Sequence, residues 1–235
     1  RLGYAWVGRV PALAGRAFPV EAYRALSSSA GVGGSLFMEA DADDYRAEAR
    51  LVAGLMADPA NGILGQIASC RPEEAGFEAW LDEGPGLGVV GYRRILHETG
   101  DDVSRSATFR ANIRRLGARG RPFDMCFLAR QLPIALELAQ ACEGTRLVLD
   151  HCGVPDIAGG AWVGWHAGVT ALAAMPNVVA KLSGVMAYCA PGTADLETRL
   201  LALALAYMSF ALENLKRWLA VFEFRLPENK PLPAD

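Results

Sequence analysis

Apolar runs of strand length alternate with amphipathic segments of helical length along most of the chain. Within 106–119, for example, Phe109, Ile113 and Leu116 recur at the spacing of one helical face. The strand-length runs are continuously apolar, which is typical of strands that are covered on both faces. The pattern therefore predicts an α/β protein with largely parallel strands.

Six strands are predicted, each separated from the next by a helix of about ten or more residues. The strands are expected at 35–40, 63–70, 87–96, 123–129, 145–151 and 178–183. The intervening helices are expected at 44–58, 73–83, 106–119, 133–142 and 162–175. Another helix opens at Pro19, and the pattern after Ala190 predicts helices at 193–206 and 212–222.

Alternating strands and helices imply right-handed crossovers, which fit either a doubly wound open sheet or a (β/α) barrel. Neither GxGxxG nor GxxxxGK[ST] follows the first predicted strand, which weakens the nucleotide-binding form of the open sheet. Polar residues gather instead at the C-terminal ends of strands, where a barrel builds its site. We therefore predict a TIM-like (β/α) barrel, with residues 1–235 forming a single domain.

Composition disfavours several kinds of binding partner and cellular location for this protein. The 235 residues carry a net charge of −3 and show no basic stripe, which disfavours nucleic acid or an anionic membrane surface as partner. The five cysteines are odd in number and never spaced as CxxC, so a disulfide framework or zinc ribbon is not expected. No apolar stretch approaches the roughly 20 residues of a membrane span. A cytoplasmic protein with a small-molecule substrate is expected.

His151 is the strongest single candidate for chemistry. It follows an apolar strand and precedes a turn containing Gly153 and Pro155, so it is expected at the mouth of a barrel. A histidine there can bind a metal or exchange protons with substrate, or serve only as a hydrogen-bonded strand end. The neighbouring Asp150 is expected to point the other way, because adjacent side chains alternate along a strand.

Arginine and histidine candidates follow the third predicted strand. Arg93 and Arg94 end that strand, and alternation predicts that one of them faces the site, where a guanidinium suits a carboxylate or a polarised carbonyl. The other reading is a solvated pair or a salt bridge to a helix. His97 lies in the following loop and is a weaker candidate for substrate binding.

Other candidates are charged or polar groups at strand ends. Lys181 lies inside an apolar strand, where lysine is rare. It is expected either to pair with a buried carboxylate or to hold a substrate oxygen. Glu39, Arg130 and Ser183 are candidates for substrate binding because each lies at or just after the end of a predicted strand. The cysteines show no sequence partner that would make them nucleophiles.

Several segments, taken in this order, resemble the amidohydrolase family 2, which includes sugar-lactone hydrolases and 2-pyrone-4,6-dicarboxylate lactonases. The resemblance runs from Tyr4 to about Thr198. It is carried by Tyr4–Trp6, Phe18–Tyr23, Phe37–Asp43, Gly91–Leu96, Pro122–Asp124, Arg130–Pro133, Leu149–Gly153 and Asn177–Gly184.

The resemblance implies a distorted TIM barrel that hydrolyses a lactone or a related ester or amide. Water attacks the carbonyl, with the help of a divalent metal such as zinc in some members and of side chains alone in others. The histidine that ends the family's sixth strand corresponds to His151, which would be a metal ligand or a proton carrier. The arginine after the fourth strand corresponds to Arg93 or Arg94.

The chain departs from the family pattern at both ends. It shows no Asp-x-His-x-His-like motif before Tyr4 and no Gly-Ser-Asp-Trp-Pro-like motif after Gly184, and it looks shortened between Glu223 and Phe224. The first and last barrel strands and part of the metal ligand set are thus not evident, and we expect that segments are missing from the sequence. The alternatives are an inert or partner-completed relative, including a homo-oligomer, and a metal-independent decarboxylase or hydratase.

Overall fold

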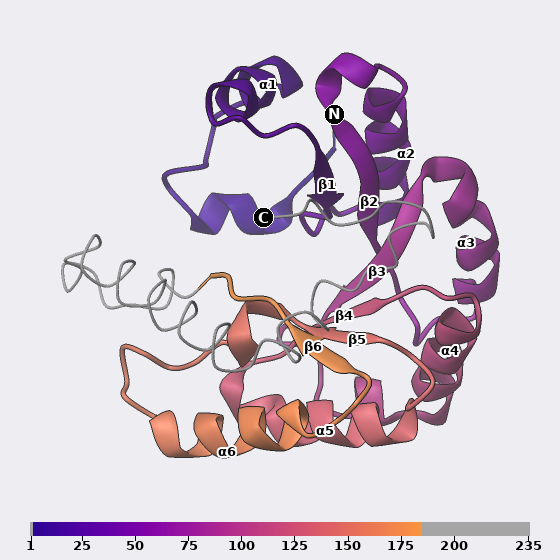
Figure 1. Ribbon diagram of the computed structural model, residues 1–235, viewed down its shortest axis with the longest axis vertical. Coiled ribbons are helices and arrows are strands. Elements are labelled where there is room, and N and C mark those ends of the chain that lie inside the picture. The colour runs from indigo at the N-terminus through magenta and orange to yellow at the C-terminus, as the bar shows by residue number, and fades with distance from the viewer. Residues whose placement is uncertain (1, 185–235) are drawn as a thin grey trace, which may run out of the picture.

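The computed structural model describes residues 2–184, and the strands in this range form one parallel sheet of six (Figure 1). The strands pair in the order of the sequence, so every neighbour in the sheet is also a neighbour along the chain. A doubly wound sheet would reverse direction at a switch point, and this one does not. The strands are β1 (Ser35–Met38), β2 (Ile63–Ser69), β3 (Val89–Ile95), β4 (Phe123–Cys126), β5 (Leu147–Leu149) and β6 (Val178–Ala180).

Six α-helices of the described region connect or precede these strands, and α2 to α6 follow one another around one side of the curved sheet (Figure 1). Two of them begin at side-chain caps, since Asp44 accepts from the Ala47 amide and Ser106 accepts from the Phe109 amide. The helices are α1 (Val20–Ser29), α2 (Tyr45–Met56), α3 (Phe77–Glu83), α4 (Ala107–Ala118), α5 (Leu132–Ala141) and α6 (Trp162–Ala173).

All six predicted strands and the six helices from Pro19 to residue 175 are therefore confirmed, and the structure has the strand order of the predicted barrel. Within residues 2–184, β1 and β6 each pair with one strand only, so the barrel is not closed there. The helices predicted at 193–206 and 212–222 lie outside the described residues. The prediction of a single domain over 1–235 stays a prediction. No helix in the described part is both long and apolar enough to cross a membrane.

The hydrophobic core lies between the sheet and its helices. Alternate strand residues such as Tyr92 and Phe123 point into it and are fully buried. The helical face predicted from the pattern is part of the same core, since Phe109, Ile113 and Leu116 are each 0% exposed. Because side chains alternate along a strand, the intervening residues lie on the opposite face, which is the inner face of a barrel.

Candidate active site

A buried network of ion pairs occupies the inner face of the sheet at its C-terminal end. At its centre, the Arg93 Nε atom of β3 donates to Glu39 Oε1 over 2.6 Å, and Nη2 donates to the Glu39 carbonyl oxygen over 2.6 Å. The Nη1 atom lies 3.4 Å from Asp150 Oδ2. The carboxylates of Glu39 and Asp150 are each 1% exposed. Arg93 therefore joins the ends of β1, β3 and β5.

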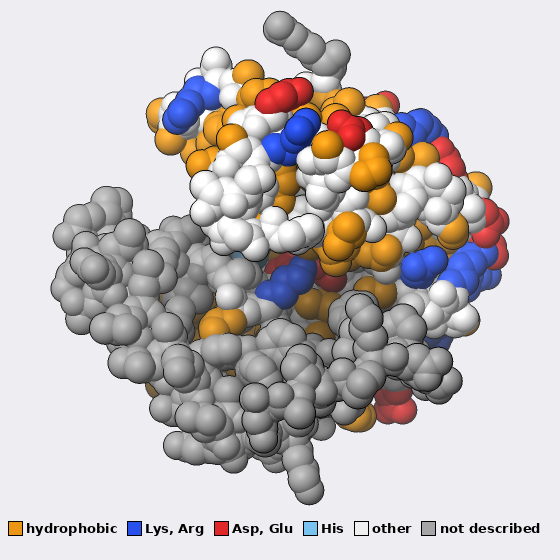
Figure 2. Space-filling view, turned by 45° about the horizontal axis from the view of Figure 1, so that its top comes forward, with side chains coloured by type: hydrophobic (Ala, Val, Ile, Leu, Met, Phe, Trp, Pro, Cys, Tyr) orange, Lys and Arg blue, Asp and Glu red, His pale blue; other side chains and the backbone are white. Residues whose placement is uncertain are grey.

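A second cation continues the network across β4 and β6. Lys181 follows β6, and its ammonium contacts the Asp124 carboxylate and lies 3.1 Å from Asp150 Oδ1. Cations and carboxylates thus alternate from Glu39 through Arg93, Asp150 and Lys181 to Asp124. Figure 2 shows side chains of both charges in a hollow of this face. Burying these groups together is tolerable because each charge faces an opposite one.

The backbone bends sharply where β5 ends. The strand stops at Leu149, and His151 and Cys152 adopt left-handed conformations with φ of 53° and 56°. The prediction that Asp150 points away from His151 is therefore wrong, because strand alternation no longer applies beyond Leu149. Donor atoms of Asp150, His151 and Cys126 all lie within 4.8 Å of one another. Such unusual backbone in a polar cluster is typical of functional sites.

His151 is half-buried and held by the segment after β6. Its Nδ1 atom lies 2.9 Å from the Ser183 hydroxyl oxygen. Burial lowers the pKa of the imidazole, although the neighbouring Asp150 carboxylate opposes this shift. Gly184 has a φ of +70°, and a Cβ atom there would lie 2.8 Å from His151 Nδ1, so the site requires glycine at this position. The ring is thus oriented by Ser183 and favoured in its neutral form.

The two arginines of β3 have different surroundings. Arg94 pairs with Glu73 over 2.6 Å and takes no part in the ion-pair network, whereas Arg93 lies at its centre. Arg93, and not Arg94, therefore faces the cluster. Arg93 and His97 line a cavity of about 310 Å³ together with Trp6.

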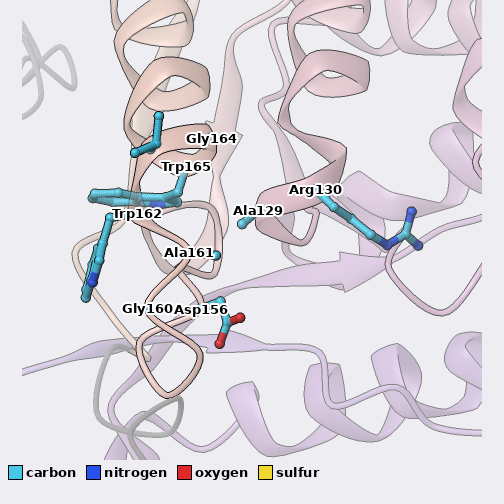
Figure 3. A pocket seen from close by; sticks show the side chains of 9 residues that line it. Ala129, Arg130, Asp156, Gly160, Ala161, Trp162, Gly164 and Trp165 are labelled. Carbon is cyan, nitrogen blue, oxygen red and sulfur yellow. The ribbon is translucent and has the colours of Figure 1, made fainter.

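Arg130 lies apart from this cluster. It pairs with Asp101 over 2.8 Å, and its side chain is 58% exposed. The loops after β4 and β5 and the start of α6 form a second, open cavity of about 440 Å³, lined by Arg130, Trp162 and Trp165. In Figure 3 the Arg130 side chain extends away from the two indole rings. The structure does not bring Arg130 together with Arg93 or His151.

Asp124 and Cys126 were not among the predicted site residues. Both lie on the inner face of β4, where Asp124 is paired in register with Arg93. The sequence did contain a signal for Asp124, because a carboxylate inside an apolar strand is as unusual as Lys181. Cys126 gave no such signal, since its Sγ atom meets His97 Nδ1 at 3.4 Å only in the folded chain.

Asp124 carries the most informative pKa shift of the site. Burial, reinforced by the nearby Asp150 charge, raises the pKa of its carboxyl from 3.8 to about 6, while Lys181 opposes the rise. The proton is thus held more tightly in the folded chain than in the unfolded one. The stability that this contributes is fully present below pH 3.8 and is lost as the pH rises through about 6.

We expect Asp124→Asn to remove this pH dependence. The free energy of unfolding of the native chain should fall, relative to that of the variant, by on the order of 1–3 kcal/mol between pH 4 and pH 7. Urea unfolding of both proteins at several pH values in this range measures the difference. A difference that stays constant with pH, or that grows in favour of the native chain, would contradict the assignment.

Comparison with known proteins places the chain in a family. The sequence profile of the amidohydrolase family matches residues 8–216. The chain belongs to the amidohydrolase family. This agrees with the resemblance carried by its ordered segments and with the parallel, sequentially ordered sheet.

Two curated relatives of this amidohydrolase are L-fucono-1,5-lactonases. The chain is 34% identical to the protein of Burkholderia ambifaria over 102 residues, which are 43% of this chain and 35% of the relative. It is 29% identical to the protein of Burkholderia multivorans over 192 residues, which are 78% of this chain and 63% of the relative. The matched region thus spans less than two thirds of the length of either relative.

Solved structures show the same fold. An amidohydrolase of Burkholderia multivorans, crystallised with bound zinc, superposes with a TM-score of 0.76 at 25% identity, over 93% of this chain and 75% of that one. A probable 2-pyrone-4,6-dicarboxylic acid hydrolase of Acinetobacter baumannii gives a TM-score of 0.64 at 14% identity, over 85% of this chain and 73% of that one. The predicted TIM-barrel architecture is therefore confirmed at the level of the fold.

Proposed function

We propose that this chain acts as a lactone hydrolase, with sugar lactones as the first substrates to consider. The main support for this proposal is the buried Arg93 network beside His151 at the C-terminal end of the parallel strands, where barrel enzymes have their active sites. The L-fucono-1,5-lactonases among the relatives support the choice of substrate. In this reaction water adds to the lactone carbonyl, the ring C–O bond breaks, and a hydroxy acid is released.

The cations of the network are suited to the carbonyl oxygen. As water adds, negative charge develops on that oxygen, and fixed positive charge nearby stabilises the transition state. Lys181 is 34% exposed and Arg93 lines the smaller cavity, so both cations lie where a substrate oxygen can approach. Glu39 is too buried to touch substrate, and we assign it to holding the Arg93 guanidinium in place.

His151 is proposed to exchange the protons of the reaction or to bind a metal ion. As a neutral imidazole oriented by Ser183, it can take a proton from water and return it to the leaving alkoxide. His97 lines the same cavity as Arg93 and is proposed to contact the substrate. Arg130 is proposed only for the outer end of a larger substrate, because it lies beside the second cavity.

The donors beside His151 also fit a divalent ion of the kind bound in the Burkholderia multivorans structure. His151, Asp150 and Cys126 offer nitrogen, oxygen and sulfur, the three donor types that zinc takes in proteins. Asp150 Oδ1 is buried without a hydrogen-bond donor, although Lys181 is close to it. Such an ion, when bound, supplies Lewis acidity toward the carbonyl and lowers the pKa of water.

A panel of sugar lactones tests the proposed function. We expect the purified chain to open at least one 1,4- or 1,5-lactone faster than buffer alone, measured as proton release with a pH indicator. Absence of turnover across the panel would favour the alternative of an inert or partner-completed barrel. The cytoplasmic location predicted from composition stays part of the proposal.

A further inference from the structure

Cys126 and His97 form a contact at the edge of the donor cluster, and the proposed function gives this contact no role. The Cys126 Sγ atom lies 3.4 Å from His97 Nδ1. The same thiol is also a member of the donor cluster with Asp150 and His151. Cys126 therefore connects the His97 ring, which follows β3, with the donors that follow β5.

From this arrangement we propose that Cys126 is a ligand of a thiophilic divalent ion, bound together with Asp150 and His151, and that His97 orients the sulfur from outside the ligand set. The inference rests on the metal-binding form of the proposed function. The set contains one thiolate, one imidazole and one carboxylate, all of which are zinc ligands. It would select zinc, cobalt or cadmium over magnesium or calcium, because a thiolate is a soft donor.

The contact with His97 suits a side chain that holds the sulfur in place. The 3.4 Å between Cys126 Sγ and His97 Nδ1 is a hydrogen-bond distance for sulfur, so the ring can orient the thiol and stabilise the thiolate once an ion is bound. The other ring nitrogen of His97 lies 4.0 Å from the Glu98 carboxylate.

The charges of the cluster also favour a divalent ion. With all three carboxylates of the network ionised, Arg93 and Lys181 leave one negative charge uncompensated. A Cys126 thiolate adds a second, and a divalent ion would neutralise both. Lys181 contacts Asp124 as well as Asp150, so it keeps a carboxylate partner when Asp150 turns to the ion.

Binding requires the thiol to lose its proton. Burial, together with the Asp150 charge, raises the pKa of Cys126 to about 12, so the thiol stays protonated without an ion. As the metal–sulfur bond forms, the S–H bond breaks and the proton passes to solvent. The change is a substitution without oxidation or reduction, and no further reactant is needed.

Cobalt absorption tests the proposal directly. The full chain is stripped with a chelator and titrated with Co²⁺, and a near-ultraviolet thiolate-to-cobalt charge-transfer band is expected to saturate at one ion per chain. Cys126→Ser should lose the band. Cys142→Ser is the matched control: Cys142 is equally buried but donates to the Arg110 carbonyl, away from the cluster, so the band should persist.

Each outcome decides the question. A native chain that shows no charge-transfer band, or a Cys126→Ser variant that keeps it, would overturn the proposal. If Cys126→Ser fails to fold, His97→Ala takes its place, because His97 is partly exposed; at least tenfold weaker Co²⁺ binding is then expected, and unchanged binding would overturn the proposal. The lactone assay is read separately, so a chain that binds Co²⁺ through Cys126 without hydrolysing lactones would refute only the function.

Discussion

Arg93→Met is expected to lower the free energy of unfolding by about 3–5 kcal/mol. The substitution keeps most of the side-chain volume but removes the guanidinium that contacts Glu39 twice and Asp150 once. Both carboxylates are almost fully buried, so Glu39 would be left as an uncompensated charge away from water. Urea unfolding followed by circular dichroism measures the loss.

Arg94→Met is the matched control, one residue further along the same strand. Arg94 pairs with Glu73, which is partly exposed and lies outside the network, and its loss should cost about 1–2 kcal/mol. Adding Glu39→Gln to Arg93→Met should recover part of the stability, because the stranded charge is then removed. If Arg93→Met destabilises no more than Arg94→Met, the network does not hold the strand ends together.

His151→Ala should reduce lactone turnover by about 10²–10⁴-fold, the usual contribution of a proton-transfer group. The imidazole is oriented by Ser183 and lies within 4.8 Å of the Asp150 and Cys126 donor atoms, so either of its proposed roles ends with its removal. Stability should change by only about 1 kcal/mol, since the ring is half-buried and water can take the place of its contact with Ser183. Initial rates at saturating lactone, compared with urea unfolding, separate the two effects.

His166→Ala is the control for this prediction. His166 lies exposed on α6, and its removal should leave turnover unchanged. Turnover that survives in His151→Ala at the native rate would refute the assignment of His151. An equal loss in both variants would point to damage of the fold instead.

The sequence predicted the elements of the described region well because their cause is local. Continuous apolar runs mark strands covered by helices, and an apolar face at helical spacing, such as Phe109, Ile113 and Leu116, marks a helix that packs on them. The alternation of the two also implied parallel strands. The order of the strands in the sheet was narrowed to two architectures, and the pairing of β1 through β6 in sequence then decided between them.

For the candidate site, the sequence predicted which residues to consider, and the structure decided which of them lie together. Sequence pattern predicted His151, Lys181 and one of Arg93 and Arg94 as site residues, since each is a charged or titratable group at or near the end of an apolar run. It predicted that only one of Arg93 and Arg94 faces inward, but could not choose, because strand alternation has no fixed phase until the strand is packed. Contact with Glu39 and Asp150 fixed that phase in the fold.

What the sequence alone determined is the list of strands and helices and the set of polar residues that end the strands, because both follow from local hydrophobic patterning. Only the tertiary structure decided that Asp150 turns toward His151, since the left-handed backbone after Leu149 breaks the alternation. Only the tertiary structure could also bring Cys126 to His97. Contacts between residues on different strands depend on sheet register, and register is set by packing across the whole sheet.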